Sequence, residues 1–378
     1  MTTLAPTLAQ WLDDHADALD SGAADPAALL ARLAQAGLFR VGVPRAAGGD
    51  GGRTSDAIAA IAAVAGHSQT AAFVLWGQRT FIEYLLQTPN RALAGRWLGP
   101  LLEGTLAGAT GLSNAMKFLG GIEALQVSAR ATDTGWQIDG ALPWVTNLNP
   151  DGFAVAVAAD DLATGRAGVY AIPYPLAGVA RGDDLDLIGL RSSHTATLRF
   201  DAVALDAGWL LHEDAHHFLP RVRPAFLGLQ CGLSIGLARR ALAAARGRSG
   251  AGRSVLDDEL DALAGELEAL AARLAGGVDG NVDGSADGSA DGSADRDDFL
   301  AAPRALFAIR IRLVELALAA MQLELQARGG AAYLRSRNDG FARRWREAAF
   351  LPVVTPSLVQ LKAELARPQP GQAPREAA

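Results

Sequence analysis

The sequence is poor in cysteine and contains no long apolar run. Its 378 residues include a single cysteine, Cys231, so an internal disulfide and any multi-cysteine metal site are excluded. This cysteine lies in the apolar run 227–235, where a small buried thiol is expected rather than a nucleophile. No charge-free apolar run reaches about 18 residues, so no membrane span is predicted.

Positive charge is also scarce. Lysine and arginine total 34 against 41 acidic residues, which gives a formal net charge of -7 and a pI of about 5.4. Without a basic surface, binding to nucleic acid or anionic lipid is not expected. The first 20 residues contain early acidic positions and lack a basic segment followed by an apolar core, so they do not read as a secretory signal. We therefore expect a cytoplasmic protein.

Hydrophobic residues make up 50% of the chain, enough for a large core in two or three domains. Residues 1–105 show helical spacing, and Asp25-Pro26 is typical of an N-cap and first helical turn. From 106 to 211 apolar and polar residues alternate in short runs, which predicts an antiparallel β-barrel or sandwich. Residues 212–367 return to helical spacing and predict a four-helix bundle. The expected fold class is α+β, mostly α.

Within the C-terminal region, helices are predicted over 223–246, 256–274, 303–328 and 351–366. The last of these is interrupted at Thr355-Pro356. The helix over 303–328 is apolar on nearly all sides, so it should be the buried member of the bundle.

Two segments are predicted to lack a fold of their own. Residues 277–298 repeat Gly-Ser-Ala-Asp, a composition typical of a flexible acidic linker, and residues 368–378 form a polar, proline-containing tail. A calcium loop in the repeat is disfavoured, because the closing glutamate is absent and the repeat is only four residues long. No metal site is predicted.

The stretch GWQIDGALPWVTN, residues 135–147, is the most informative local pattern. Apolar and polar residues alternate before Asp139-Gly140, a favoured turn pair, and Trp144 and Thr146 follow on what should be a second strand. The pattern predicts a β-hairpin. A plain half-buried hairpin explains it as readily as a functional one.

With the elements in this order, the chain resembles the acyl-CoA dehydrogenase family over nearly its whole length. Each matching motif is weak alone, but five in the same order and spacing form a strong signal. The motifs are LAQAGLFRVGVPRAAGGDGG (33–52), GWQIDGALPWVTN (135–147), IGLRSSHTATLRFDAVAL (188–205), LQARGGAAY (325–333) and RRWREA (343–348).

The resemblance implies FAD between the β domain and the helical bundle. Trp144 and Thr146 match the family's tryptophan and threonine beside the isoalloxazine ring and its N5. Thr110 matches the threonine of a Thr-Glu-Pro segment that contacts the flavin, and Ser113 also survives from that otherwise eroded segment. An aromatic ring that stacks on the flavin and a hydroxyl near N5 suit this chemistry.

The same resemblance implies that a neighbouring subunit completes the site. Gln326, Gly329 and Gly330 match the segment that approaches the pyrophosphate, where glycines allow backbone N–H groups to come close. Arg253 is matched to an arginine that reaches a partner's pyrophosphate, although the Phe-Gly that follows it in the family is absent here. A homodimer or homotetramer is therefore expected.

The catalytic base of the family is missing from both positions where its members carry it. Family dehydrogenases use a carboxylate to remove the α-proton of an acyl thioester. Its usual position is Thr355 here, and the alternative position on the first bundle helix lies in 218–240, which contains no Asp or Glu. A threonine hydroxyl cannot act as a general base near neutral pH without help. Glu83 and His194 are remote candidates.

Three hypotheses follow. The first is an FAD-dependent acyl-CoA dehydrogenase-like oxidoreductase that acts on an acyl-CoA or similar thioester, has an unconventional base and passes electrons to an acceptor. The second is a two-component flavin monooxygenase of the same fold, which uses O₂ and reduced flavin (FMN in this case) from a partner reductase and needs no α-proton base. The third is a non-catalytic relative that binds flavin or acyl-CoA.

Overall fold

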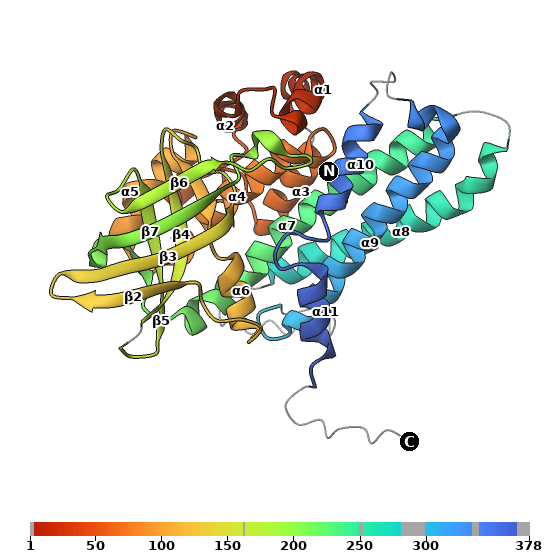
Figure 1. Cartoon of the computed structure of the whole chain (residues 1–378). Coiled ribbons are helices and arrows are strands. Elements are labelled where there is room, and N and C mark those ends of the chain that lie inside the picture. Colours follow the sequence, from red (N-terminus) through yellow and green to blue (C-terminus); the bar gives the residue numbers. More distant parts are fainter. Residues whose placement is uncertain (1–3, 162, 249–251, 281–298, 335–339, 369–378) are drawn as a thin grey trace.

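The computed structural model describes residues 4–161, 163–248, 252–280, 299–334 and 340–368 (Figure 1). Helices form the first part of the chain, a sheet the middle, and helices the last part, in the predicted order. The first helices are α1 (Pro6–Ser21), α2 (Pro26–Gln35), α3 (Thr54–Ala65), α4 (Gln69–Gln87) and α5 (Arg91–Leu102). As predicted, Asp25 caps α2 by accepting a hydrogen bond from the N–H of Ala27.

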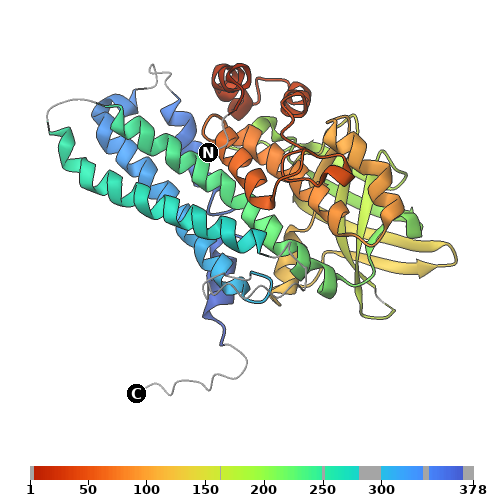
Figure 2. The same ribbon diagram turned by 180° about the vertical axis from the view of Figure 1, so that it is seen from behind.

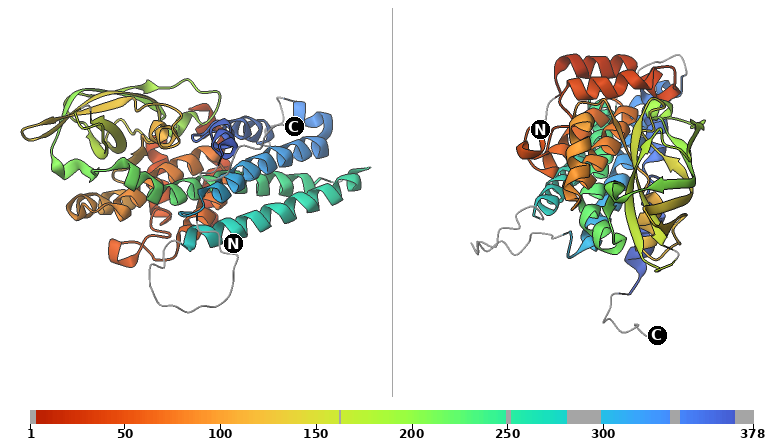
Figure 3. Two further views of the ribbon diagram at one scale, coloured as in Figure 1. Left: turned by 90° about the horizontal axis from the view of Figure 1, so that it is seen from below. Right: turned by 90° about the vertical axis from the view of Figure 1, so that its left-hand side faces the viewer.

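The central β region forms one mixed sheet. Its strands are β1 (Ala107–Thr110), β2 (Val127–Thr132), β3 (Gly135–Val145), β4 (Phe153–Asp161), β5 (Ala167–Tyr174), β6 (Val179–Asp184), β7 (Ala196–Leu205) and β8 (Leu210–His212). The strand order is β6-β7-β3-β2-β4-β5-β8, with β1 beside β4. Most pairs are antiparallel, as predicted, but β4 pairs in parallel with both β1 and β2. Helix α6 (Ser113–Leu119) follows β1, and α4 and α5 cover one face of the sheet (Figures 2 and 3).

The predicted turn at Asp139-Gly140 is wrong. Strand β3 passes through both residues without interruption and pairs with β2 on one side and β7 on the other. A register shift against β7 occurs at this point, and the Asp139 carboxylate accepts a 2.7 Å hydrogen bond from the N–H of Ala202. This bond lowers the pKa of Asp139. Gly140 has a φ of 139°, and a Cβ there would collide with the Gln126 carbonyl oxygen. The glycine thus allows two strands to approach closely instead of forming a turn.

The C-terminal part contains three long helices, α7 (Ala215–Arg246), α8 (Asp257–Asp279) and α9 (Pro303–Arg328). Helix α9 has the predicted bounds, whereas α7 starts eight residues before the predicted helix and continues through two prolines. The interruption predicted at Thr355-Pro356 in the fourth helix, 351–366, is confirmed, but residues 351–357 are not helical. The chain instead forms α10 (Phe341–Phe350) and α11 (Leu358–Ala366), separated by a loop that contains Thr355-Pro356.

Small residues bring α3 onto α7. A Cβ at Gly232 would lie 2.8 Å from the Ile61 side chain, and one at Gly236 would collide with the carbonyl oxygen of Ala62. These glycines are spaced by four and therefore share one helix face. The neighbouring Cys231 is fully buried, as predicted, and burial raises the pKa of its thiol to about 12.

Helix α8 extends into the segment predicted as a linker, since it continues to Asp279. The Asp279 carboxylate accepts hydrogen bonds from the N–H and hydroxyl of Ser55, which orders this end of the helix against α3. Residues 281–298 and 369–378, which contain the rest of the predicted linker and nearly all of the predicted tail, lie outside the described residues. In the part of the chain that the structure covers, no helix has the length and apolarity needed to cross a bilayer.

Replacing Gly140 with alanine should destabilise the protein strongly. Alanine would have to adopt the positive φ of Gly140, which costs a residue with a side chain about 1–3 kcal/mol. The collision with the Gln126 carbonyl oxygen adds about 1–3 kcal/mol. Gly165 is a matched control, because its φ is also positive (65°) but nothing lies within 4 Å of its Cβ position. Urea denaturation should show a clearly larger loss for Gly140→Ala than for Gly165→Ala; equal losses would contradict the close approach of the strands.

Candidate functional site

A cavity of about 590 Å³ lies where the sheet meets the helices. One wall comes from β1, α6, the end of β3 and the segment before β7. The opposite wall comes from α4, α10, α11 and the loop between the last two. The lining residues are Phe73, Trp76, Thr110, Ser113, Lys117, Trp144, Thr146, Leu187, Ile188, Gly189, Leu190, Thr195, Arg346, Ala349, Phe350, Val353, Val354, Thr355, Ser357 and Gln360.

Four of the predicted cofactor residues meet in this cavity: Thr110, Ser113, Trp144 and Thr146. The hydroxyl-bearing side chains of Thr110 and Thr146 are buried, whereas Trp144 remains 61% exposed. A large exposed indole beside buried hydroxyls offers a flat apolar surface with polar groups near it. This arrangement fits a planar, partly polar ring such as that of a flavin.

Hydroxyl groups form short chains behind this wall. Thr146 Oγ1 lies 2.9 Å from Thr195 Oγ1, which lies 2.8 Å from Ser193 Oγ. Thr110 Oγ1 lies 2.8 Å from the hydroxyl of Tyr84. Burial raises the pKa of Tyr84, so this phenol stays neutral. The cavity-facing hydroxyls are therefore held in fixed positions by other uncharged groups.

A buried amide joins the two walls. Gln78 on α4 donates 2.9 Å hydrogen bonds from Nε2 to the carbonyl oxygens of Leu101 and Leu106. Its Oε1 accepts from the N–H of Gly108 (2.6 Å) and from Nδ2 of Asn147 (2.9 Å). Asn147 directly follows Thr146, so the end of β3 is fixed to α4.

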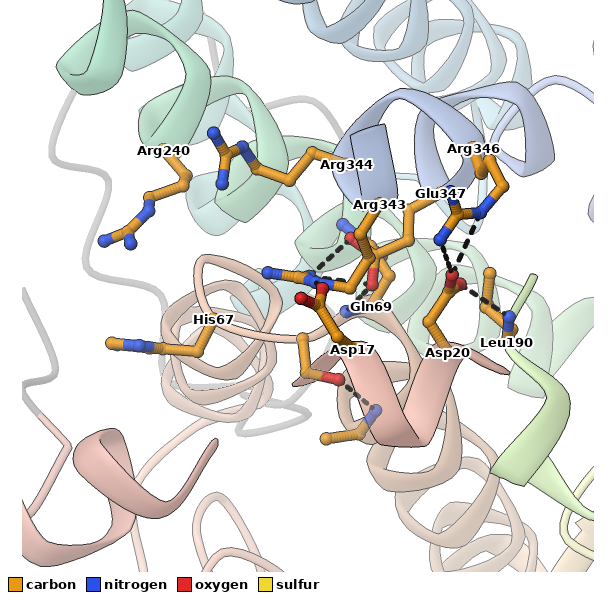
Figure 4. A network of polar contacts seen from close by, with 12 residues as sticks. Asp17, Asp20, His67, Gln69, Leu190, Arg240, Arg343, Arg344, Arg346 and Glu347 are labelled. Atoms are coloured by element: carbon orange, nitrogen blue, oxygen red, sulfur yellow. Dashed lines mark hydrogen bonds and ion pairs between the residues drawn. The ribbon is translucent and has the colours of Figure 1, made fainter. Parts of the chain in front are cut away.

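A buried carboxylate from α1 shapes another part of the cavity (Figure 4). Asp20 accepts a 2.9 Å hydrogen bond from the N–H of Leu190. It also accepts from Nη2 (2.6 Å) and Nε (3.1 Å) of Arg346. Leu190 and Arg346 both line the cavity, and a side chain at Gly189 would press on the same carboxylate. Nothing in the local sequence pattern signalled this role for Asp20.

The same face of α1 makes further ion pairs with the C-terminal helices. Asp17 accepts a 2.9 Å hydrogen bond from Nε of Arg343, whose Nη1 binds the buried Glu347 (Figure 4). Burial raises the pKa of Glu347, although the Arg343 guanidinium opposes this shift. The Glu347 carboxylate also accepts from the N–H of Gln69 at the start of α4. The matched motif RRWREA thus connects α1, α4 and α10.

Another buried network holds the loop between α10 and α11. Arg310 Nε donates to Gln230 Oε1 (2.7 Å), and Gln230 Nε2 donates to the carbonyl oxygen of Thr355 (3.0 Å). Arg310 also reaches the carbonyl oxygen of Leu351. Both side chains are fully buried in helices that sequence periodicity marked as apolar. They place Thr355 in the cavity wall through its backbone.

Among the described residues that line the cavity, none is an aspartate, glutamate or histidine. Its two cationic residues are already paired, Lys117 with Glu123 at 2.9 Å and Arg346 with Asp20. The remote candidates lie outside the lining: Glu83 accepts a hydrogen bond from Gln87, and His194 pairs with Asp184 at 3.1 Å. The polar wall atoms available to a ligand are therefore mainly hydroxyls and the amide of Gln360, with no carboxylate or imidazole base.

The remaining predicted cofactor residues form a separate group. Arg253, in the short 3-10 helix η4 (Arg253–Leu256), donates a 3.4 Å hydrogen bond to the carbonyl oxygen of Gln326. Gly329 lies beside its guanidinium and Gly330 is next in the chain. Arg253 lines a second cavity of about 180 Å³ with Arg246 and Arg248.

Helix α7 separates the two groups. Gln230 contacts Thr355 of the larger cavity, and Arg246 lines the smaller one. Sixteen helical residues between them correspond to about 24 Å along the helix axis. Within one chain, Arg253 and its neighbours therefore do not join Trp144 and Thr146 in a single pocket.

Residues 3–105 match the family model described as acyl-CoA dehydrogenase, N-terminal domain. Mitochondrial short-chain specific acyl-CoA dehydrogenase from Homo sapiens is 27% identical over 224 residues, which cover 58% of this chain and 53% of that protein. Benzylmalonyl-CoA dehydrogenase from Aromatoleum aromaticum is 27% identical over 250 residues, 63% of this chain and 65% of the relative. The chain thus spans about half the length of the first curated relatives it matches, at 53%.

Solved structures share the whole architecture. Butyryl-CoA dehydrogenase from Megasphaera elsdenii superposes with a TM-score of 0.77 and 20% identity, over 97% of this chain and all of that chain (100%). KijD3, solved with FMN and a dTDP-linked amino sugar, gives a TM-score of 0.75 and 21% identity over 95% of this chain and 90% of the other. At these identities the likeness shows a shared fold.

Replacing Asp20 with asparagine should destabilise the protein by about 2 kcal/mol. The amide still accepts from Leu190, but it removes the charge that pairs with Arg346 and points N–H groups toward a guanidinium. Asp186→Asn is the matched control, because its pair with Arg191 is largely exposed and should contribute nothing measurable. Urea denaturation of both variants measures the difference, and equal stability would contradict a structural role for Asp20.

Proposed function

We propose that this chain is a flavin-dependent oxidoreductase of the acyl-CoA dehydrogenase family that acts on an acyl-CoA or similar thioester. One observation carries this proposal. The exposed Trp144 indole and the hydroxyls of Thr110 and Thr146 form one wall of a cavity of about 590 Å³, which leaves an opposite wall for a substrate.

The residues present fit a flavin. Trp144 offers a face for stacking, Thr146 and Thr110 offer hydroxyls for hydrogen bonds, and the exposed indole has no ring partner among the described residues. A bound flavin would supply the electron-accepting chemistry, while the chain would bind, orient and shield the reacting groups. FAD is the proposed form, with FMN as the alternative if the protein uses reduced flavin from a partner.

The division of the cofactor residues supports a homodimer or homotetramer. Arg253 brings positive charge to the group that it forms with Gln326, Gly329 and Gly330, and the glycines allow a pyrophosphate to approach the backbone closely. Because this group lies about 24 Å along α7 from the larger cavity, it would serve the flavin of a second copy. Catalysis would then depend on assembly.

The composition of the cavity also favours a second candidate. A dehydrogenase that removes an α-proton needs a base, and the described lining residues provide no carboxylate or imidazole. A two-component flavin monooxygenase, supplied with reduced flavin by a reductase, does not need that base. The dehydrogenase reading is supported by the relatives, whose names state activity on short-chain acyl-CoA and benzylmalonyl-CoA.

Anaerobic titration should separate these activities. We expect the purified protein to carry flavin, and acyl-CoA thioesters should bleach its absorbance slowly, because the described lining residues include no carboxylate or imidazole base. Thr355→Glu places a carboxylate in the cavity wall and should accelerate bleaching about 100-fold or more over Thr355→Gln, its uncharged control. Rapid bleaching by the unmodified protein would show that a base acts from outside the described lining. Reductase-dependent O₂ consumption without bleaching would support the monooxygenase.

A subunit-mixing experiment tests the shared site. Trp144→Ala and Arg253→Ala should each lower flavin content in homo-oligomers, because each removes one side of every site. Co-expression with two affinity tags yields mixed oligomers in which one site contains both intact groups. Flavin content should recover in these mixed oligomers and not in either parent. If the flavin content of the mixed oligomers stays as low as that of the two parent variants at every mixing ratio, a site shared between copies is contradicted.

A further inference from the structure

Three aromatic rings from the helices line the cavity that Trp144 and Thr146 also line. Phe73 and Trp76 on α4 stack with their centroids 5.3 Å apart and their planes 2° from parallel. Phe350 on α10 meets Phe73 edge to face, at 4.7 Å and 69°. All three residues line the cavity, and together they are termed the aromatic wall.

The aromatic wall is rigid. Trp76 Nε1 donates a 3.2 Å hydrogen bond to the carbonyl oxygen of Phe226, and the Phe226 ring meets the indole edge to face. Phe73 and Trp76 are otherwise buried, so their remaining exposed surface faces the cavity. No methionine or other long, unbranched apolar side chain is present among the described lining residues to rearrange around an extended guest. A long alkyl chain would have to displace a ring that is stacked and held through a hydrogen-bonded neighbour.

The space between the two walls is limited. A volume of about 590 Å³ is in the middle of the range of ~300–1,000 Å³ for pockets that hold one drug-sized molecule. Under the proposed function it must accept both a flavin ring against Trp144 and the reacting part of the substrate. The substrate group is therefore compact. It is also uncharged, because Lys117 and Arg346 are neutralised by Glu123 and Asp20.

We propose that the aromatic wall selects a substrate whose group within the cavity is a single uncharged aromatic ring, of phenyl size, over an extended alkyl chain. The proposal rests on the proposed function, since it places the flavin on the opposite wall. A phenyl ring can meet Phe73 and Phe350 edge to face or offset-stacked. Each such aromatic pair typically improves binding roughly two- to tenfold beyond the area it buries.

Binding of a matched ligand series tests this selectivity. The full-length protein with its flavin is titrated with phenylacetyl-CoA, butyryl-CoA and decanoyl-CoA, and with free phenylacetate and decanoate, and Kd is read from flavin absorbance and from calorimetry. Phenylacetyl-CoA should bind about tenfold or more tightly than decanoyl-CoA, and more tightly than butyryl-CoA. The proposal is overturned if decanoyl-CoA binds as tightly as phenylacetyl-CoA or more tightly, or if butyryl-CoA binds as tightly as phenylacetyl-CoA. It is also overturned if no probe binds, either as a CoA thioester or as a free acid.

The two readouts distinguish the proposal from the function on which it rests. Calorimetry does not require a flavin. If the protein contains no flavin after purification and takes up none when flavin is added, the flavin function is contradicted. If that protein still binds the phenyl probes more tightly, the selectivity of the aromatic wall remains supported. Protein that retains flavin and prefers decanoyl-CoA overturns the selectivity alone.

A variant pair locates the selectivity. Phe73→Ala should remove most of the preference, with the ratio of decanoyl-CoA to phenylacetyl-CoA affinity rising about tenfold. Phe81→Ala is the control, because Phe81 is buried on the same helix but packs against Tyr84 and Trp97, outside the cavity lining. It should lose stability and keep the ratio. An unchanged ratio in Phe73→Ala, or an equal shift in both variants, overturns the proposal; if either variant fails to fold, the ligand series decides it.

Discussion

The site depends on one buried side-chain amide, that of Gln78. Its oxygen accepts two hydrogen bonds and its nitrogen donates two, so all four positions of the amide are satisfied within the protein. These bonds join α4 to the end of α5, to β1 and to Asn147 after β3. Because α4 carries Phe73 and Trp76, and Trp144 and Thr146 lie at the end of β3 and directly after it, this amide fixes these two parts of the cavity lining relative to each other. A buried amide of this kind has few acceptable alternatives, since each lost bond leaves a polar group unpaired away from water.

Local patterns were sufficient to predict the order of helices and strands and the bounds of α9. They were insufficient wherever two distant segments decide the outcome. Asp139-Gly140 has the composition of a turn, yet the approach of β2 and the backbone of Ala202 make it part of a continuous strand. Asp20 and Arg346 are separated by 326 positions, so nothing in either neighbourhood signals their pairing. Arg310 and Gln230 lie in helices that look apolar, because periodicity measures the average character of a face and misses a single paired polar group.

In the site, too, some residues were predicted from the sequence and others were missed. Thr110, Ser113, Trp144 and Thr146, which the family resemblance implies as flavin contacts, come from three different parts of the chain and line one cavity. The aromatic wall was missed, because Phe73 and Trp76 on an apolar helix have the same pattern as core residues. Only their place in the lining of the cavity that also holds Trp144 distinguishes them. Gln78 lies on the same helix, and its role is structural because all four of its hydrogen bonds are made within the protein.

The charged residues that line the cavity are all paired in the same way. Every cationic lining residue has a carboxylate partner from another segment, and every carboxylate partner is outside the lining. Ion pairs therefore position the walls, while hydroxyls and aromatic rings form the surface that a ligand meets. A surface of this kind discriminates between guests by shape and by a few hydrogen bonds, because it has no free charge with which to attract or reject them. Because the described lining includes no carboxylate or imidazole, a proton released in the cavity would have to pass to the ligand or to solvent.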